Sequence, residues 1–182
     1  VRAVIALQGE GGTLTPEPEV PEPEVPEVVA GPNNSISYTS SDSYELALYT
    51  EMGFGANITS TTFDAETKSG TIIFDGDVTR IPTMAFKICL TLKTITLPGS
   101  ITKIEDEAFY GCKGLTTIDI PNSVLSIGIS AFFDCTALKS ANLGTGVTTI
   151  GNMAFKSCSA LESITIPESV TTLGTQVFMD CD

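Results

Sequence analysis

The five cysteines are the residues of this sequence whose type and spacing most suggest chemistry. Each follows the previous one by 23 residues, at Cys89, Cys112, Cys135, Cys158 and Cys181. Thiolates bind zinc, form disulfides or act as nucleophiles in proteins. A zinc site needs ligands that converge on one point, whereas a constant period predicts side chains in a straight row. The chain also has no histidine that would activate a thiolate for nucleophilic attack.

Disulfides between neighbouring cysteines of such a row are not expected either. Stacked Cα atoms would lie within disulfide range, but their parallel Cβ vectors do not suit the torsion that an S–S bond requires. We therefore interpret the row as small, buried, weakly hydrogen-bonding side chains that close successive structural units.

Two acidic clusters offer oxygen atoms of the kind that bind Ca²⁺, Asp75-Gly76-Asp77 and Glu105-Asp106-Glu107. Neither has the graded spacing of an EF-hand loop. A turn at the first and favourable charge at a helix N-terminus at the second are the simpler explanations, and we prefer them to Ca²⁺ binding. The sequence also contains no G-x-S-x-G elbow, and residues 9–12 lack the Lys-Ser/Thr of a phosphate loop. We therefore assign no catalytic residue, no cofactor and no metal ligand, and predict that the protein is not an enzyme.

The charge balance argues against several classes of partner. The 182 residues include nine Lys plus Arg against 22 Asp plus Glu, which gives a formal charge of −13. A surface this acidic repels nucleic acid and anionic lipid. No apolar run approaches the roughly 18 residues that suggest a membrane span. We therefore expect a protein that binds no nucleic acid and does not span a membrane.

The first 70 residues divide into three segments. Residues 1–12 contain the apolar run Val4-Ile5-Ala6-Leu7, which is either the end of an upstream domain or a strand that pairs with an edge of the main body. Residues 13–32 repeat Pro and Glu, which predicts an extended polyproline II linker more than a ligand for a proline-binding domain. Residues 33–70 carry alternating strand patterns at 36–38, 44–49 and 58–63, and we interpret them as an N-terminal β cap.

From residue 71 onward the sequence repeats with the period of the cysteines. Phe86, Phe109, Phe132, Phe155 and Phe178 keep the same 23-residue spacing, and a small apolar residue precedes each of them. Two apolar columns with strand alternation run through Ile72, Ile95, Ile118, Ala141 and Ile164, and through Phe74, Leu97, Ile120, Leu143 and Ile166. Because one unit of 23 residues cannot bury these positions alone, stacked units must bury them against each other. The repeat therefore predicts a solenoid, mainly β, with a short helical segment in each unit around Ala-Phe.

The unit reads Leu-x-x-Ile-x-Ile-Pro-x-x-Val-x-x-Ile-x-x-x-Ala-Phe-x-x-Cys. It is seen best in Ala108-Phe109-Tyr110-Gly111-Cys112 and Ile120-Pro121-Asn122-Ser123-Val124. This pattern resembles the BspA-type leucine-rich repeat. The resemblance implies a right-handed parallel β array over residues 71–182, with just under five repeats, and a location at the bacterial cell surface or outside the cell. It also implies roles in adhesion to host matrix proteins or to other bacteria.

The outward positions of the predicted strands are small, polar and almost uncharged. They are Thr94, Thr96, Thr117, Asp119, Ser140, Asn142, Ser163 and Thr165, continued towards the N-terminus by Thr71 and Ile73. This shared chemistry favours a non-catalytic binding face for a protein or glycan ligand, and the alternative is a passive spacer in a larger surface protein. The last unit stops before its next Leu, so we also expect self-association through an uncapped C-terminal coil or a natural chain that continues.

Overall fold

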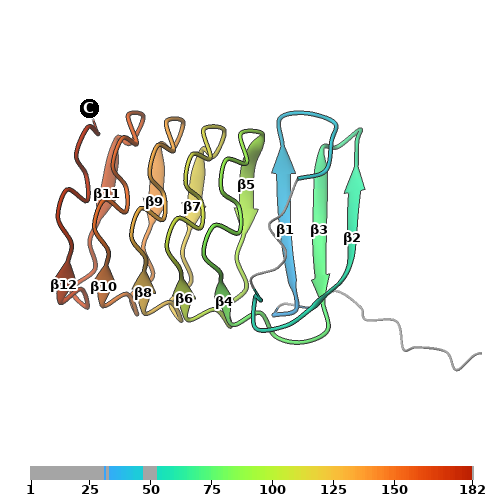
Figure 1. Ribbon diagram of the computed structural model, residues 1–182, viewed down its shortest axis with the longest axis horizontal. Helices are drawn as coiled ribbons and strands as arrows, with labels where there is room; N and C mark the ends of the chain where they lie inside the picture. The colour runs from blue at the N-terminus through green and yellow to red at the C-terminus, as the bar shows by residue number, and fades with distance from the viewer. Residues whose placement is uncertain (1–30, 32, 47–52, 182) are drawn as a thin grey trace, which may run out of the picture.

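A computed structural model describes residues 31, 33–46 and 53–181 of the chain. Residues 1–12, predicted as a strand or the end of an upstream domain, and the predicted Pro/Glu linker, apart from Gly31, lie outside the described residues. Two strand types make up the solenoid, one row of longer strands and one row of two-residue strands at the opposite edge (Figure 1). The strands are β1 Ser35–Ser40, β2 Ile58–Asp64, β3 Ser69–Phe74, β4 Arg80–Ile81, β5 Leu92–Thr96, β6 Lys103–Ile104, β7 Thr117–Asp119, β8 Ser126–Ile127, β9 Ser140–Asn142, β10 Thr149–Ile150, β11 Ser163–Thr165 and β12 Thr172–Leu173.

Three sheets arise from these strands. Sheet A has the order β2-β3-β1-β5, with antiparallel pairs throughout. Sheet B has the order β12-β10-β8-β6-β4 and sheet C the order β11-β9-β7, and both are parallel. In sheets B and C the paired residues are 23 apart, as in Ile104 with Ile127 and Ile118 with Ala141. The sequence period is therefore one turn of a parallel β solenoid, which confirms the predicted fold class.

The aromatic column forms a continuous stack along the solenoid axis. Ring centroids of Phe86, Phe109, Phe132 and Phe155 lie 5.0–5.1 Å apart with interplanar angles of 4–7°. Phe178 continues the stack at 5.8 Å and 19°. The first four rings are fully buried. Because parallel strands lie about 4.8 Å apart, each ring meets its neighbour at stacking distance, and such pairs add roughly 0.5–1.5 kcal/mol beyond area burial.

The predicted helical segments are wrong, because the residues around Ala-Phe form turns. Each turn contains two residues with positive φ, such as Glu107 at 56° and Gly111 at 69°, which end any right-handed helix. The backbone amides also bond across units instead of within one. Phe109 N donates to Ala131 O at 2.8 Å, and Phe132 N donates to Ala154 O at 2.7 Å. The turns are therefore stabilised by coil-to-coil hydrogen bonds that an isolated unit lacks.

Gly128 shows how closely neighbouring coils approach at these turns. A Cβ atom built on it would lie 2.5 Å from Asp106 N and from Glu105 C. Its column mates Gly151 and Gly174 are equally crowded by backbone of the preceding coil. The glycine column is therefore required by the close stacking of backbones and does not introduce a helix.

Residues 33–74 differ from the sequence prediction in two respects: one predicted strand is not formed, and β3 does not pair with the strand that the repeat predicts. β1 and β2 confirm the patterns at 36–38 and 58–63, whereas Tyr44–Leu46 form no strand and residues 47–49 lie outside the described part. β3 carries the first members of both strand columns, Ile72 and Phe74, but it does not stack on β5 as the period predicts. β1 lies between them and pairs with both strands.

The antiparallel strands contact the first coil through β1 and through Phe54. Tyr38 of β1 pairs with Ile95 of β5, and both are buried. The ring of Phe54 lies 6.3 Å from that of Phe86 at 68°, so it meets the end of the aromatic stack edge-on. These contacts show how the N-terminal strands meet the first coil. The interpretation of residues 33–70 as a cap stays a prediction.

Candidate functional site

The eight outward residues singled out in the sequence lie on one surface of sheets A and C. Seven are exposed and Ser140 is half-buried. They alternate with buried residues such as Ile95 and Ile118, because successive side chains of a strand point to opposite faces. In sheet C the pairing aligns Asp119 with Asn142 and Thr165, and Thr117 with Ser140 and Ser163.

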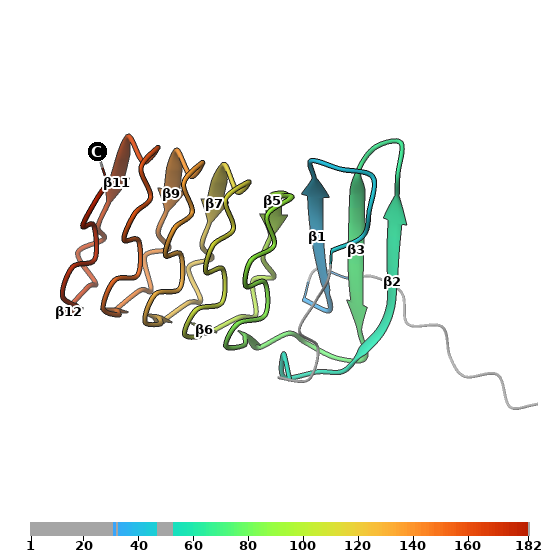
Figure 2. The same cartoon turned by 45° about the horizontal axis from the view of Figure 1, so that its top comes forward.

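The same surface continues over the antiparallel strands. Ser37 of β1 pairs with Thr96 of β5 on one side and with Thr71 of β3 on the other. Thr39 likewise pairs with Thr94 and with Ser69. Figures 1 and 2 show the strands side by side from β11 to β2. We name this surface the hydroxyl face. Its two rows are Thr62, Thr71, Ser37, Thr96, Asp119, Asn142 and Thr165, and Asp64, Ser69, Thr39, Thr94, Thr117, Ser140 and Ser163.

The register corrects the predicted N-terminal end of this surface. The 23-residue period aligns Ile73 with Thr96, but in the structure Ser37 joins Thr96 to Thr71, two residues earlier. Ile73 instead pairs with Ser35, outside the row. Sequence reasoning missed Ser37 and Thr39 altogether, although Ser35–Ser40 already showed the outward Ser/Thr alternation that marks β5.

Asp119 of β7 and Asn142 of β9 are neighbours in one exposed row of sheet C. Asn142 Nδ2 donates to Asp119 Oδ1 at 2.5 Å, so the two side chains hold each other in place. A shallow hollow lies on each side of this pair. The one of about 200 Å³ is lined by Thr96, Asp119 and Pro121 among others, and the one of about 490 Å³ by Asn142, Thr165 and Glu168 among others.

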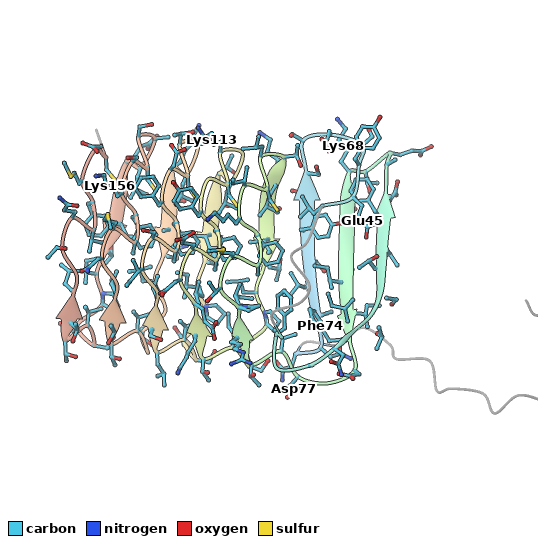
Figure 3. All side chains as sticks on the ribbon, viewed as in Figure 1. Glu45, Lys68, Phe74, Asp77, Lys113 and Lys156 are labelled. Carbon is cyan, nitrogen blue, oxygen red and sulfur yellow. The ribbon has the colours of Figure 1, made fainter. Side chains whose placement is uncertain are left out.

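The lysines that line the edge of the solenoid lie outside these hollows. Figure 3 shows Lys113 and Lys156 along the edge of the cysteine turns, with Lys68 at the same edge of sheet A. Lys113 pairs with Asp134 at 3.0 Å, and Lys156 pairs with Asp180 at 3.9 Å. On the same edge the rings of Tyr110 and Phe133 stack at 4.9 Å. The hydroxyl face is therefore separate from the charged and aromatic edge.

The cysteines confirm the structural interpretation and refine it. Four thiols each donate to the carbonyl of a phenylalanine 26 residues earlier, at 3.0–3.2 Å, as in Cys112 with Phe86 and Cys135 with Phe109. The same carbonyls accept a backbone amide within their own coil, as Phe109 O does from Cys112 N at 3.2 Å. The thiol therefore satisfies the second lone pair of a buried carbonyl, which gives a reason for Cys at this position of the repeat.

Burial keeps three of the thiols, Cys89, Cys112 and Cys135, protonated. It raises the pKa of Cys89 from the ordinary 9.0 to about 11. Burial also raises the pKa of Cys112 and Cys135 well above the ordinary value. All five cysteines are present as thiols. A thiol held neutral in this way is a poor nucleophile and a poor metal ligand.

The acidic clusters make contacts within the protein. Asp75 accepts from Asn57 Nδ2 and from Asn57 N, each at 2.8 Å, and these hydrogen bonds lower its pKa. Asp106 accepts the amide of Ile129 at 2.7 Å, and Glu107 pairs with Lys87 at 2.5 Å. Over the described ranges, no three His, Cys, Asp or Glu side chains gather as a metal site would require. Over the same ranges, no helix has the length and apolarity to cross a membrane.

Comparison with known proteins identifies the repeat. The BspA type leucine rich repeat region matches residues 56–182 in six copies. The chain is similar to the crystal structure of the leucine rich repeat protein TpLRR of T. pallidum, with a TM-score of 0.58 and 34% identity over 59% of this chain and 50% of that one. It is also similar to a leucine rich cell surface protein from Faecalibacterium prausnitzii A2-165, with a TM-score of 0.54 and 38% identity over 57% of this chain and 27% of that one.

This chain thus spans half of the T. pallidum protein and about a quarter of the F. prausnitzii protein. No curated protein matches it. The repeat match covers more than half of the chain. The residues that define the repeat are the ones that stack from coil to coil, as Phe109 does on Phe132 and as the Cys135 thiol does against the Phe109 carbonyl. The chain belongs to the BspA-type leucine-rich repeat family.

Proposed function

We propose that this protein is a non-catalytic binding module at the bacterial cell surface or outside the cell, and that the hydroxyl face takes a protein or glycan ligand. The observation that carries the proposal is the uniform chemistry of that face over strands of different origin. β1 and β3 lie outside the parallel stack, yet they present the same Ser and Thr side chains in register with β5.

Simple solubility does not require this pattern, because charged side chains on scattered positions would serve it as well. Of the eight residues singled out on β5 to β11, only Asp119 is charged. Exposed hydroxyls and amides accept and donate hydrogen bonds at little desolvation cost. A ligand that crosses several strands would make many such contacts on a backbone that is already ordered, which limits the entropy lost on binding.

The location is supported by the relatives. The F. prausnitzii protein is described as a cell surface protein, and the family resemblance implies adhesion. The buried, protonated thiols and the acidic clusters engaged in protein contacts support a role without catalysis.

The test is a double substitution on the parallel part of the hydroxyl face, Asp119→Arg on β7 with Asn142→Arg on β9. It places two long cations on exposed positions and should change the free energy of unfolding by under about 0.5 kcal/mol per site, as surface substitutions generally do. The matched control is Asp77→Arg with Thr102→Arg, which makes the same change in charge at exposed positions before strands of sheet B (Asp77 is labelled in Figure 3).

Capture of extracellular-matrix proteins and of polysaccharides from an immobilised array should fall at least tenfold for the first variant and stay unchanged for the control. If both folded variants capture as the unmodified protein does, the site lies elsewhere. If the unmodified protein captures nothing, the passive spacer is the correct interpretation.

A further inference from the structure

A third hollow on the hydroxyl face lies where the antiparallel strands meet the first coil. It has a volume of about 470 Å³ and is lined by hydroxyl side chains from four strands, Ser37, Thr39, Thr62, Thr71, Thr94 and Thr96, together with Asp64 and Ser69. Tyr38, Phe63 and Gly70, which alternate with these residues along their strands, complete the lining. Because Ser37, Thr39, Thr94 and Thr96 belong to the two rows of the hydroxyl face, the hollow lies on that face of sheet A. We name it the hydroxyl hollow. Its volume is within the range of about 300–1,000 Å³ typical of small-ligand sites.

The hydroxyls in this hollow are paired across strands. Thr39 Oγ1 lies 2.7 Å from Thr94 Oγ1, and Ser37 Oγ lies 3.3 Å from Thr71 Oγ1. A hydroxyl has one hydrogen and two lone pairs, so each pair keeps one donor and three acceptor positions for a ligand. The two pairs are held on neighbouring, hydrogen-bonded strands. This density of fixed donors and acceptors complements a ligand that itself carries many hydroxyls.

The charges around the hollows select among such ligands. No Lys or Arg lines any of the three hollows on this face, whereas Asp64, Asp119 and Glu168 each line one of them. A uronic acid or a sulfated sugar would therefore meet negative charge without a compensating cation. An uncharged sugar chain meets no such penalty.

The same surface is poor in the residues that anchor protein partners. Energetically dominant interface residues are most often Trp, Tyr and Arg, and the two rows contain none of these. Tyr38 and Phe63 also line the hollow, but Tyr38 is only 3% exposed and pairs with the buried Ile95, and its ring lies 6.2 Å from that of Phe63. The two rings therefore stack on the other face of sheet A. A protein ligand would thus find hydrogen-bond partners on this surface but none of the exposed Trp, Tyr or Arg side chains that dominate the binding energy of protein interfaces.

We propose that the hydroxyl hollow is a subsite for a neutral glycan, and that the sugar chain runs from it across the strands toward the Asp119–Asn142 pair. The inference rests on the proposed binding function and narrows it to one ligand class. From β2 to β11 the face is seven strands wide, roughly 29 Å at about 4.8 Å per strand. Affinity should therefore rise with the length of the oligosaccharide until the chain spans the face.

The experiment compares retention of the full chain by neutral and anionic polysaccharides. The probes are dextran, mannan and xylan on one side, and heparin and polygalacturonate on the other, in affinity electrophoresis with oligosaccharide competitors of increasing length. The variant Thr39→Val with Thr94→Val removes one hydroxyl pair and keeps β-branched side chains, which suit strands. Its control, Thr61→Val with Thr102→Val, removes two exposed hydroxyls outside the hollow. Thr61 pairs with the buried Ile72 and therefore belongs to the other face of sheet A.

We expect at least one neutral polysaccharide to retain the protein, the hollow variant to bind at least tenfold more weakly, and the control to bind unchanged. Thr62→Arg, at an exposed position on the outermost strand, blocks the hollow by a second route should the valine variant fold poorly.

Retention by the anionic polymers alone would overturn the inference, as would equal binding by both folded hollow variants and the control. Capture of a protein ligand that depends on Asp119 and Asn142, without retention by any polysaccharide, would overturn the glycan subsite and leave the proposed binding function intact. Absence of capture by every probe would overturn both.

Discussion

Removal of one thiol from the cysteine column should destabilise the fold by an amount that the structure allows us to work out. Cys135 is fully buried, and its thiol donates to Phe109 O at 3.2 Å. Cys135→Ala removes a group about as large as a methylene, worth about 0.8 kcal/mol in transfer free energy. It also removes a weak hydrogen bond and leaves a small cavity, each worth about 0.5 kcal/mol. We expect the free energy of unfolding to fall by about 2 kcal/mol.

Cys181 offers a matched control in the same column. Its thiol donates to Phe155 O at 3.0 Å, but the side chain is only partly buried. Cys181→Ala should therefore cost less than about 1 kcal/mol, because both the transfer and the cavity contributions shrink with exposure. Urea unfolding followed by circular dichroism measures both variants under the same conditions. An equal loss at the two positions, or no loss at Cys135, would refute the idea that a buried thiol completes the hydrogen bonding of the phenylalanine carbonyl.

Three further predictions follow from the coil interior. Stability should fall as pH rises from about 9 toward 11, because the pKa of Cys89 is about 11 in the native state and 9.0 for an ordinary thiol, so the unfolded chain loses its proton first. Urea unfolding midpoints measured across this pH range test the prediction. At pH 8, DTNB should label the native thiols far more slowly than the unfolded ones. Gly128→Ala should lower the free energy of unfolding by at least about 2 kcal/mol, because its Cβ would lie 2.5 Å from the backbone of the previous coil. The Cβ of Gly76→Ala would come no closer than 3.8 Å to another atom, so this variant should be neutral within about 1 kcal/mol. Thermal unfolding compares the two variants. Ala141→Ile should be neutral or stabilising by up to roughly 2 kcal/mol, because it restores the residue of the neighbouring coils, and a lower melting temperature would show that the neighbours already fill the space.

The periodic part of the fold could be predicted from the sequence because each column obeys one packing rule. Phe109 stacks on Phe132 because the two residues are one 23-residue coil apart. Cys135, 26 residues after Phe109, is brought to the Phe109 carbonyl by the same coil-on-coil stacking. The turns could not be predicted as well. Ala-Phe-x-x-Cys has helical spacing, and only the residues that accept positive φ, such as Gly111 and Asp134, gave a signal against a helix.

The candidate site was predicted only where it belongs to the repeat. Thr96, Asp119 and Thr165 follow from strand alternation, and the structure places them on one surface. The insertion of β1 between β3 and β5 could not be predicted, because antiparallel pairing of a segment outside the repeat leaves no period in the sequence. As a result Ile73 was placed in the row that Thr71 and Ser37 occupy.

The constant separation between bonded residues has a consequence for how such proteins evolve in length. Thiol and carbonyl are always 26 residues apart, and paired strand residues in sheets B and C are always 23 apart. Duplication or loss of one whole unit in the gene therefore gives every remaining side chain an equivalent neighbour, so no new core has to be invented. The surface grows or shrinks in steps of about 4.8 Å. Recombination between repeats can thus adjust the reach of the molecule while the chemistry of each step changes independently, as Ala141 and Asn142 already differ from their neighbours.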